Sequence, residues 1–165
     1  LVAAWNWTET TVDNAGAEVD RNKVVNLENR NPHHRGVFTY NHFLNNLRFL
    51  LRARYYDDWV VGDWSDDPTD PGPDGTGYTL TCAVPGVSYE DNCYGGETIF
   101  DAEVAYTFAV KYSVIVGMQN LLDEKGPTNI DNSDGTIGDG STYTGTNPWG
   151  YEGGFWYVRL RADFD

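Results

Sequence analysis

Basic residues are scarce in this sequence: 11 Lys and Arg stand against 25 Asp and Glu, for a formal net charge of -14. Nucleic acids require a basic surface, so this balance argues against nucleic acid as a partner. The chain also lacks any run of about 18 apolar residues, which excludes a transmembrane helix. It begins at Leu1 without Met or a signal peptide, and we expect a processed or truncated product.

Motifs of the common catalytic sites are missing as well. No G-x-S-x-G, H-E-x-x-H or P-loop pattern occurs. The acidic segment 130–141 superficially resembles a calcium loop, but aligning Gly135 with the glycine of that motif puts Ile130 at the first ligand position. We therefore predict that the protein is not an enzyme and has neither a cofactor nor a metal site.

Cysteine is limited to Cys82 and Cys93, which lie close together in one polar segment. A zinc site would need further ligands nearby, and none of the three histidines is in that segment. We favour a disulfide between Cys82 and Cys93, which indicates an oxidising compartment.

What the sequence has in abundance is alternation of apolar and polar residues, clearest over residues 98–123. On its first arm one face carries Phe100, Ala102, Val104, Tyr106 and Phe108. The opposite face carries Ile99, Asp101, Glu103, Ala105 and Thr107. A period of two places successive side chains on opposite faces of a strand, so we predict a β-hairpin with one apolar and one polar face.

Similar patterns predict six strands of about nine to twelve residues each. They cover 1–12, 36–43, 47–59, the two arms of 98–123, and 155–164. Segments 13–35, 61–97 and 124–154 are rich in polar residues, Gly and Pro, and are predicted as loops, with an ordered part near Val24 to Leu27 in the first of them.

Connections therefore alternate long, short, long, short, long. A soluble sandwich usually has loops of comparable length at both ends, whereas a transmembrane β-barrel has short periplasmic turns and long outer loops. Every strand arginine also falls in the polar phase, and an arginine facing lipid would cost about 2–4 kcal/mol. We predict an all-β fold, an antiparallel transmembrane β-barrel segment of about six strands.

Aromatic residues near the predicted strand ends suit the interfacial girdles of such a barrel. They are Trp5, Trp7, Tyr55, Tyr56, Trp59, Phe155 and Trp156.

The charged side chains in the polar phase are candidate lumen-facing residues. They are Arg48, Arg52, Arg54, Asp101, Glu103, Arg159 and Arg161. The arginines could form an anion-attracting track or a ladder of salt bridges with carboxylates. Asp101 and Glu103 are interpreted as a polar wall rather than a catalytic carboxylate pair.

Several histidines and aromatic residues in the predicted loops are candidate contacts for a small ligand such as a sugar or a flat chelate. They are His33, His34, Trp64, Tyr78, Tyr89, Tyr94, Trp149 and Tyr151.

Two terminal segments carry a resemblance to a known family. TIFDAEVAYTF followed by YSVIVGMQNLLDEKGP, and NPWGYEGGFWYVRLRADF, resemble the last strands of TonB-dependent outer-membrane receptors. NRNPHHRGVFTYNH and LRFLLRARYYDDW are similar to the preceding strand pair. The resemblance covers essentially the whole chain, residues 1–165, and implies that it is the C-terminal part of a larger barrel plugged by a separate N-terminal domain. Leu122 stands where the family usually has Phe, and Asp165 follows the aromatic residue on which it commonly ends.

The resemblance implies a receptor in the outer membrane of a Gram-negative bacterium, taking up a scarce ligand such as a ferric siderophore, haem, a vitamin or an oligosaccharide. Its partners would be outer-membrane lipid, the small ligand, and the TonB complex through a plug domain that this chain lacks. The alternatives are a secreted carbohydrate-binding β-sandwich and a small self-contained porin-like barrel.

Overall fold

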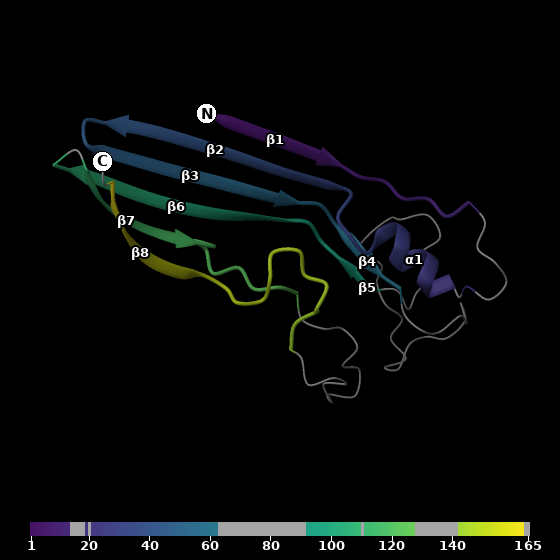
Figure 1. Cartoon of the computed structure of the whole chain (residues 1–165). Coiled ribbons are helices and arrows are strands. Elements are labelled where there is room, and N and C mark those ends of the chain that lie inside the picture. The colour runs from purple at the N-terminus through teal and green to yellow at the C-terminus, as the bar shows by residue number, and fades with distance from the viewer. Residues whose placement is uncertain (14–18, 20, 63–91, 110, 128–141, 164–165) are drawn as a thin grey trace.

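The computed structural model describes residues 1–13, 19, 21–62, 92–109, 111–127 and 142–163. Its elements are β1 (Val2–Trp7), α1 (Arg21–Asn29), β2 (His34–Leu44), β3 (Leu47–Tyr56), β4 (Trp59–Val61), β5 (Asn92–Tyr94), β6 (Glu97–Phe108), β7 (Tyr112–Gln119) and β8 (Phe155–Ala162). Six strands form one antiparallel sheet in the order β1-β2-β3-β6-β7-β8, and β4 pairs with β5 separately. The predicted all-β, antiparallel fold class is confirmed (Figure 1).

The short connections lie at one end of the sheet and the long ones at the other (Figure 1). Strands β2 and β3 are joined by a two-residue turn in which Asn45 has a φ of 50°. Strands β6 and β7 are joined through residues 109–111, and Ala109 also has a φ of 50°. The predicted alternation of long and short connections is therefore confirmed.

Burial alternates along the strands with the predicted phase. On β6, Ile99, Asp101 and Glu103 are buried, whereas Phe100 and Val104 are exposed. The register carries this phase across the sheet, since Leu50 is opposite Glu103 and Leu51 is opposite Ala102. We call the face that bears Asp101 and Glu103 the inner face, and the face that bears Phe100 and Val104 the outer face.

The outer face is apolar, and much of it is exposed. Its largest exposed side chains include Leu51 (55 %), Val116, Val158 and Leu160 (77 %). None of the outer-face residues of the six strands is Asp, Glu, Lys or Arg. The usual arrangement of a water-soluble sheet, with apolar residues buried and charged residues exposed, is therefore reversed.

Strand β3 is shorter than predicted. It ends at Tyr56, and Trp59–Val61 forms the separate strand β4, which pairs with Asn92–Tyr94. The break follows the Asp57-Asp58 pair, where the Asp57 N–H still donates to the His34 carbonyl (3.0 Å). The prediction that the third strand extends to Trp59 is therefore wrong. The prediction that 61–97 is a loop is wrong for the residues of β4, β5 and the start of β6. Strands β1 and β8 are likewise shorter than predicted.

Helix α1 lies within segment 13–35, predicted as a loop with an ordered part near Val24 to Leu27; the ordered part is a helix of nine residues. Val25 packs with Val60 and Cys93 in a small apolar core. Asn26 makes two hydrogen bonds to the backbone of Gly62, at 3.2 and 3.0 Å. The helix has no acidic residue in its first turn, and these contacts with β4 and Gly62 stabilise it.

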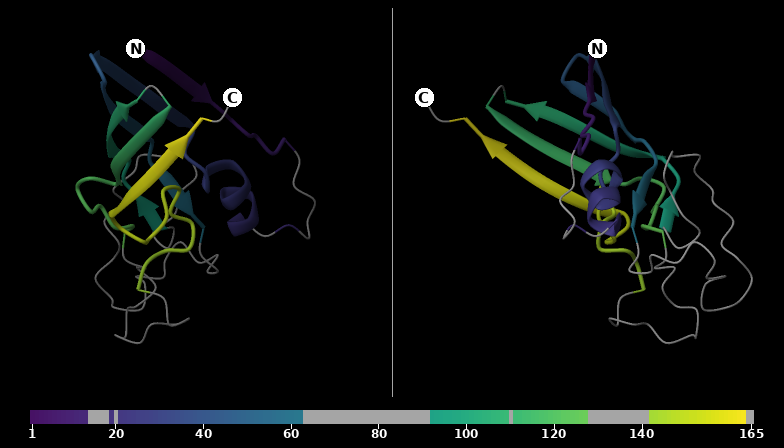
Figure 2. Two further views of the ribbon diagram at one scale, coloured as in Figure 1. Left: turned by 60° about the vertical axis from the view of Figure 1, so that its left-hand side comes forward. Right: turned by 90° about the vertical axis from the view of Figure 1, so that its right-hand side faces the viewer.

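The sheet is twisted and curved, and α1 lies beyond the long-loop ends of the strands (Figure 2). Strands β1 and β8 form its two edges and do not pair with each other. The described residues have no second large sheet such as a β-sandwich requires. No helix in the described part of the chain is long and apolar enough to cross a membrane.

Candidate functional site

Every charged side chain of the six strands lies on the inner face. They are Arg35, Arg48, Arg52, Arg54, Glu97, Asp101, Glu103, Arg159 and Arg161. The structure thus brings the seven predicted lumen charges onto one face, although their assignment to a lumen stays a prediction.

Glu103 is the centre of the largest charged cluster. Its carboxylate is 9 % exposed and contacts the Arg48 guanidinium. The Tyr157 hydroxyl donates to Glu103 Oε2 (2.7 Å), and Arg159 Nη2 lies 3.7 Å from the same oxygen. The cluster therefore joins β3, β6 and β8.

A glycine on β7 makes this connection possible. Tyr157 is the cross-strand neighbour of Gly117, and its side chain lies across β7 to reach Glu103 on β6. A Cβ atom at position 117 would clash with the Tyr157 ring. Glycine in a strand often marks such a close approach, and here it lets strands that are not neighbours share a hydrogen bond.

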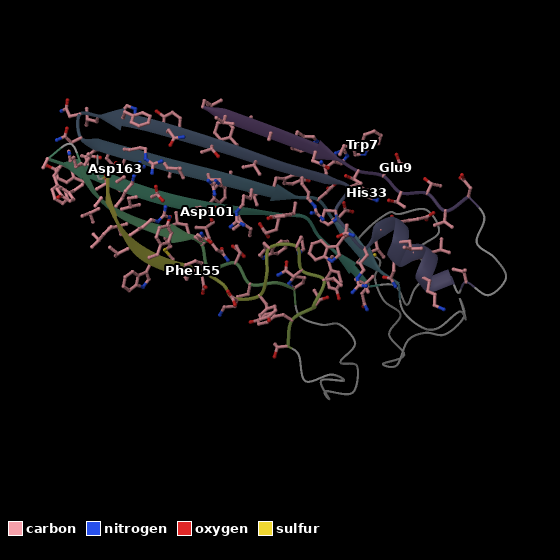
Figure 3. The ribbon with its side chains drawn as sticks, viewed as in Figure 1. Trp7, Glu9, His33, Asp101, Phe155 and Asp163 are labelled. Carbon is pink, nitrogen blue, oxygen red and sulfur yellow. The ribbon has the colours of Figure 1, made fainter. Side chains whose placement is uncertain are left out.

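Asp101 forms a second cluster, closer to the long-loop end. Arg54 Nη2 donates to Asp101 Oδ1 (2.9 Å), and the backbone N–H of Asn120 donates to the same oxygen (3.0 Å). Asp101 lies in the body of the sheet, whereas Asp163 lies at the short-turn end and His33 at the long-loop end (Figure 3). This carboxylate thus ties β3 to the end of β7.

The turn after β7 is closed by the side chain of Asn120. Its amide donates to the Glu124 carbonyl (2.6 Å) and accepts from the Glu124 N–H (2.9 Å). Asn120 and Asp123 have φ values of 51° and 58°, a left-handed conformation that Asn and Asp tolerate better than most residues. Asp123 Oδ1 also accepts from the Gly154 N–H (2.8 Å), which joins this turn to the segment before β8.

We expect Asn120→Ala to lower the free energy of unfolding by about 2–4 kcal/mol. The reason is that a left-handed alanine is strained and two side-chain hydrogen bonds are lost. Asn120→Gly removes the bonds without the strain, so its effect should be about half as large. Urea unfolding of the protein in lipid vesicles measures both variants. Equal losses for Ala and Gly would show that strain at this position is unimportant.

The remaining inner-face arginines differ in their partners. Arg161 pairs with Asp163 (3.0 Å), and both side chains are largely exposed. Arg52 is the cross-strand neighbour of Asp101 and lies between Arg48 and Arg54 on the same face of β3. Because Arg48, Arg54 and Arg159 have carboxylate partners, the interpretation as salt bridges has direct geometric support at these three arginines.

Aromatic rings connect the long loops. Trp59 stacks on Tyr94 (5.2 Å between centroids) and meets Trp149 edge to face (5.5 Å), while Tyr56 lies 5.7 Å from Trp149. Trp59 Nε1 donates to Thr146 Oγ1 (3.2 Å). Trp59 is 1 % exposed, so its predicted place in an outer girdle is wrong; Tyr56 and Phe155 also fall in the inner-face phase.

The predicted ligand contacts are not brought together as one group. His33 Nε2 lies 2.8 Å from the Glu28 carbonyl, whereas the His34 ring stacks on Trp7 on the outer face. Tyr94 is buried in the aromatic cluster, Trp149 is half-buried and Tyr151 is 61 % exposed. Trp64, Tyr78, Tyr89 and the predicted disulfide partner Cys82 lie outside the described residues. Ligand contact and the disulfide stay predictions.

Between β3 and β4, desolvation together with a hydrogen bond to Asp57 and the charge of that residue raises the pKa of the Asp58 carboxyl. Within the described residues no group of three or more His, Cys, Asp and Glu is arranged to hold a metal ion.

The geometry defines an antiparallel sheet with a charged inner face and an apolar outer face. No protein-family model matches the chain, and no curated protein matches it. A solved structure that it resembles is the crystal structure of the siderophore receptor PirA from Acinetobacter baumannii, at 16 % sequence identity and a TM-score of 0.49. The match covers 84 % of this chain and 17 % of that receptor, so the chain spans about a sixth of the receptor's length.

Proposed function

We propose that this chain is the C-terminal section of an outer-membrane β-barrel wall, whose outer face contacts lipid and whose inner face lines a lumen. The observation that carries the proposal is the segregation of charge: all charged strand residues are on the inner face, and the exposed outer face is apolar across six strands. Exposed apolar surfaces of this size mark an interaction site. Lipid is the occupant that requires every outward side chain to be uncharged.

Strand dimensions and connections support the same occupant. Strand β3 has ten residues, and at about 3.3 Å per residue and a tilt of about 40° it spans about 25 Å. The hydrocarbon-facing band of outer-membrane barrels has about this height. Aromatic residues flank the band on the outer face: Trp5, Trp7 and Tyr55 near the long loops, and Phe108 and Tyr112 near the short turns. Such positions suit the two membrane interfaces.

The motifs of segments 98–123 and 147–164 support a more specific role, a TonB-dependent receptor for a scarce small ligand such as a ferric siderophore. In this proposal the short turns face the periplasm and the long connections face outward. Uptake is energised by the TonB complex through a plug domain outside this chain. The buried Glu103 and Asp101 clusters hold the wall rigid, and the loops contact the ligand.

Nitroxide labels introduced by cysteine substitution test the lipid contact. In the protein inserted into vesicles, labels at Val104, Val116 and Leu160 should be accessible to oxygen, which dissolves in lipid, and shielded from a water-soluble nickel chelate. Labels at the inner-face positions Thr107 and Ser113 are the matched controls and should show the opposite preference. Water accessibility at the three outer positions would contradict the membrane proposal.

A further inference from the structure

A recess of about 250 Å³ lies on the inner side of the long-loop end, where β3, β7 and β8 converge. Its walls include Arg54, Asn120, Trp149, Tyr151, Glu152 and Phe155. Sites for drug-sized ligands occupy about 300–1,000 Å³, so this recess has room for one ring-sized group. The residues before β8 thus bring aromatic and charged side chains against the ends of two other strands.

Two buried hydrogen-bond donors belong to the walls of this recess. Arg54 Nε and Trp149 Nε1 are buried and have no hydrogen-bond partner among the described residues. A buried donor without an acceptor is unfavourable, since its N–H group has lost water and gained nothing in return. Both atoms donate only, so the group that would satisfy them must present oxygen acceptors.

Neighbouring contacts hold both donors in place. Arg54 is fixed by its bond to Asp101 (2.9 Å), and the Trp149 indole is packed against Trp59 and Tyr56. Tyr151, at the recess, is 61 % exposed, so it can move aside without disturbing a packed core. The positions of both donors are therefore already set, which favours binding once the wall side chains that cover them move aside.

The charge of the recess argues for a neutral ligand. The Arg54 cation is balanced by Asp101, and Glu152 adds a further carboxylate to the walls. A carboxylate or phosphate on the ligand would bring another negative charge beside Glu152 without a second cation in the walls to offset it. Hydroxyl groups suit these walls better, because each can accept from Arg54 or Trp149 and donate to Glu152.

Aromatic rings complete the chemistry of the recess. Tyr151 and Phe155 are both exposed side chains that line the recess, and Trp149 contributes a third ring. An aromatic side chain offers apolar area with little loss of conformational entropy. A ring that has hydroxyl groups at its edge and apolar C–H groups on its face matches both parts of the recess.

We infer that this recess binds one neutral sugar ring of a hydroxylated ligand. The inference deepens the proposed function, on which it rests for the ligand's access through the long-loop end of the barrel. Arg54 and Trp149 donate to ring hydroxyls, Glu152 accepts from one, and Tyr151 packs on the ring face.

Titration of the purified full-length protein in detergent micelles tests this inference. The probes are glucose, maltotriose, citrate and 2,3-dihydroxybenzoate, followed by saturation-transfer NMR of the probe. We expect saturable binding of maltotriose with a Kd on the order of 1 mM, and weaker binding of citrate. Trp149→Phe keeps the ring and removes the N–H donor, and should weaken maltotriose binding about tenfold.

Arg54→Lys is the second variant, because lysine keeps the charge beside Asp101 but loses Nε, and it should weaken binding by a similar factor. Trp156→Phe, on the outer face, is the matched control and should leave binding unchanged.

The inference is overturned if citrate or dihydroxybenzoate binds tighter than maltotriose, if maltotriose does not bind, or if both variants bind maltotriose like the wild type. The nitroxide-label experiment tests the barrel separately. If the label at Val116 contacts lipid but maltotriose does not bind, only the inference about the recess is refuted. If that label contacts water, the barrel proposal is refuted.

Discussion

Replacing Leu51 by arginine is expected to lower the free energy of unfolding in a membrane by about 2–4 kcal/mol. Leu51 is the middle outer-face residue of β3 and is 55 % exposed, so an arginine there would be placed near the centre of the hydrocarbon layer. In a water-soluble sheet the same change at an exposed leucine would be close to neutral. The result therefore separates lipid contact from water contact.

Leu50 supplies a matched control one residue away. Its side chain is on the inner face, with Asn41 and Glu103 as cross-strand neighbours. Leu50→Arg is expected to change stability by less than about 1 kcal/mol, because an arginine beside a carboxylate is favourable across strands. Urea unfolding of both variants in vesicles measures the difference, and equal losses at positions 50 and 51 would contradict opposite environments for the two faces.

Replacing Glu103 by alanine is expected to cost about 2–4 kcal/mol. Removing one partner of a fully buried ion pair costs about 3–5 kcal/mol, and the lower figure here allows for the partial exposure of Arg48, whose side chain is 32 % exposed. The loss arises because Arg48 and Arg159 lose their shared carboxylate and the Tyr157 hydroxyl loses its acceptor.

Glu103→Gln should have about half that effect, since the amide oxygen still accepts from Tyr157 while the charge is lost. Glu97→Gln is the control on the same strand and face. Glu97 accepts from the Thr98 N–H (2.9 Å) at the long-loop end, and its replacement should cost less than about 0.5 kcal/mol. If the midpoints of urea unfolding for the Glu103 and Glu97 variants coincide, the cluster does not stabilise the sheet.

The strands and their faces could be predicted from the sequence because one physical rule acts along each of them. Alternation between Phe100 and Asp101, or Leu51 and Arg52, reports two different surroundings at a period of two. Once one residue of a strand is assigned to a face of the sheet, the alternation assigns the other residues of that strand. The turn at Asn45 lies between the predicted strands 36–43 and 47–59, and the turn at Ala109 lies between the two predicted arms of 98–123.

Features that depend on contacts between distant residues could not be predicted in the same way. Helix α1 has a polar composition and no acidic first turn, and it is held by Val60 and Gly62, which lie far along the chain. Trp59 follows β3 closely enough to resemble a girdle residue, yet the chain turns after Asp58 and buries it.

Contacts within the candidate site were equally hidden. The bond between Tyr157 and Glu103 spans 54 positions and crosses an intervening strand. Gly117, a glycine within an otherwise well-formed strand, was the one local signal for it. Asn120 and Asp123 belong to a motif that carries the family resemblance, but only the φ values and the bonds to Glu124 and Gly154 explain why these residue types stand there.

The Glu103 cluster has a consequence for the register of the sheet. Strand β8 forms one edge of the sheet, and its Tyr157 and Arg159 reach a carboxylate that Arg48 of β3 also contacts. Pairing with β7 alone therefore gives β8 its backbone bonds, while the bonds from Tyr157 and Arg159 to Glu103 also require β6 to pair with β7 in register. A shifted β6–β7 register would move Glu103 away from Tyr157 and Arg159 and leave β8 with its backbone bonds to β7 alone, so we expect the cluster to favour one register of these three strands.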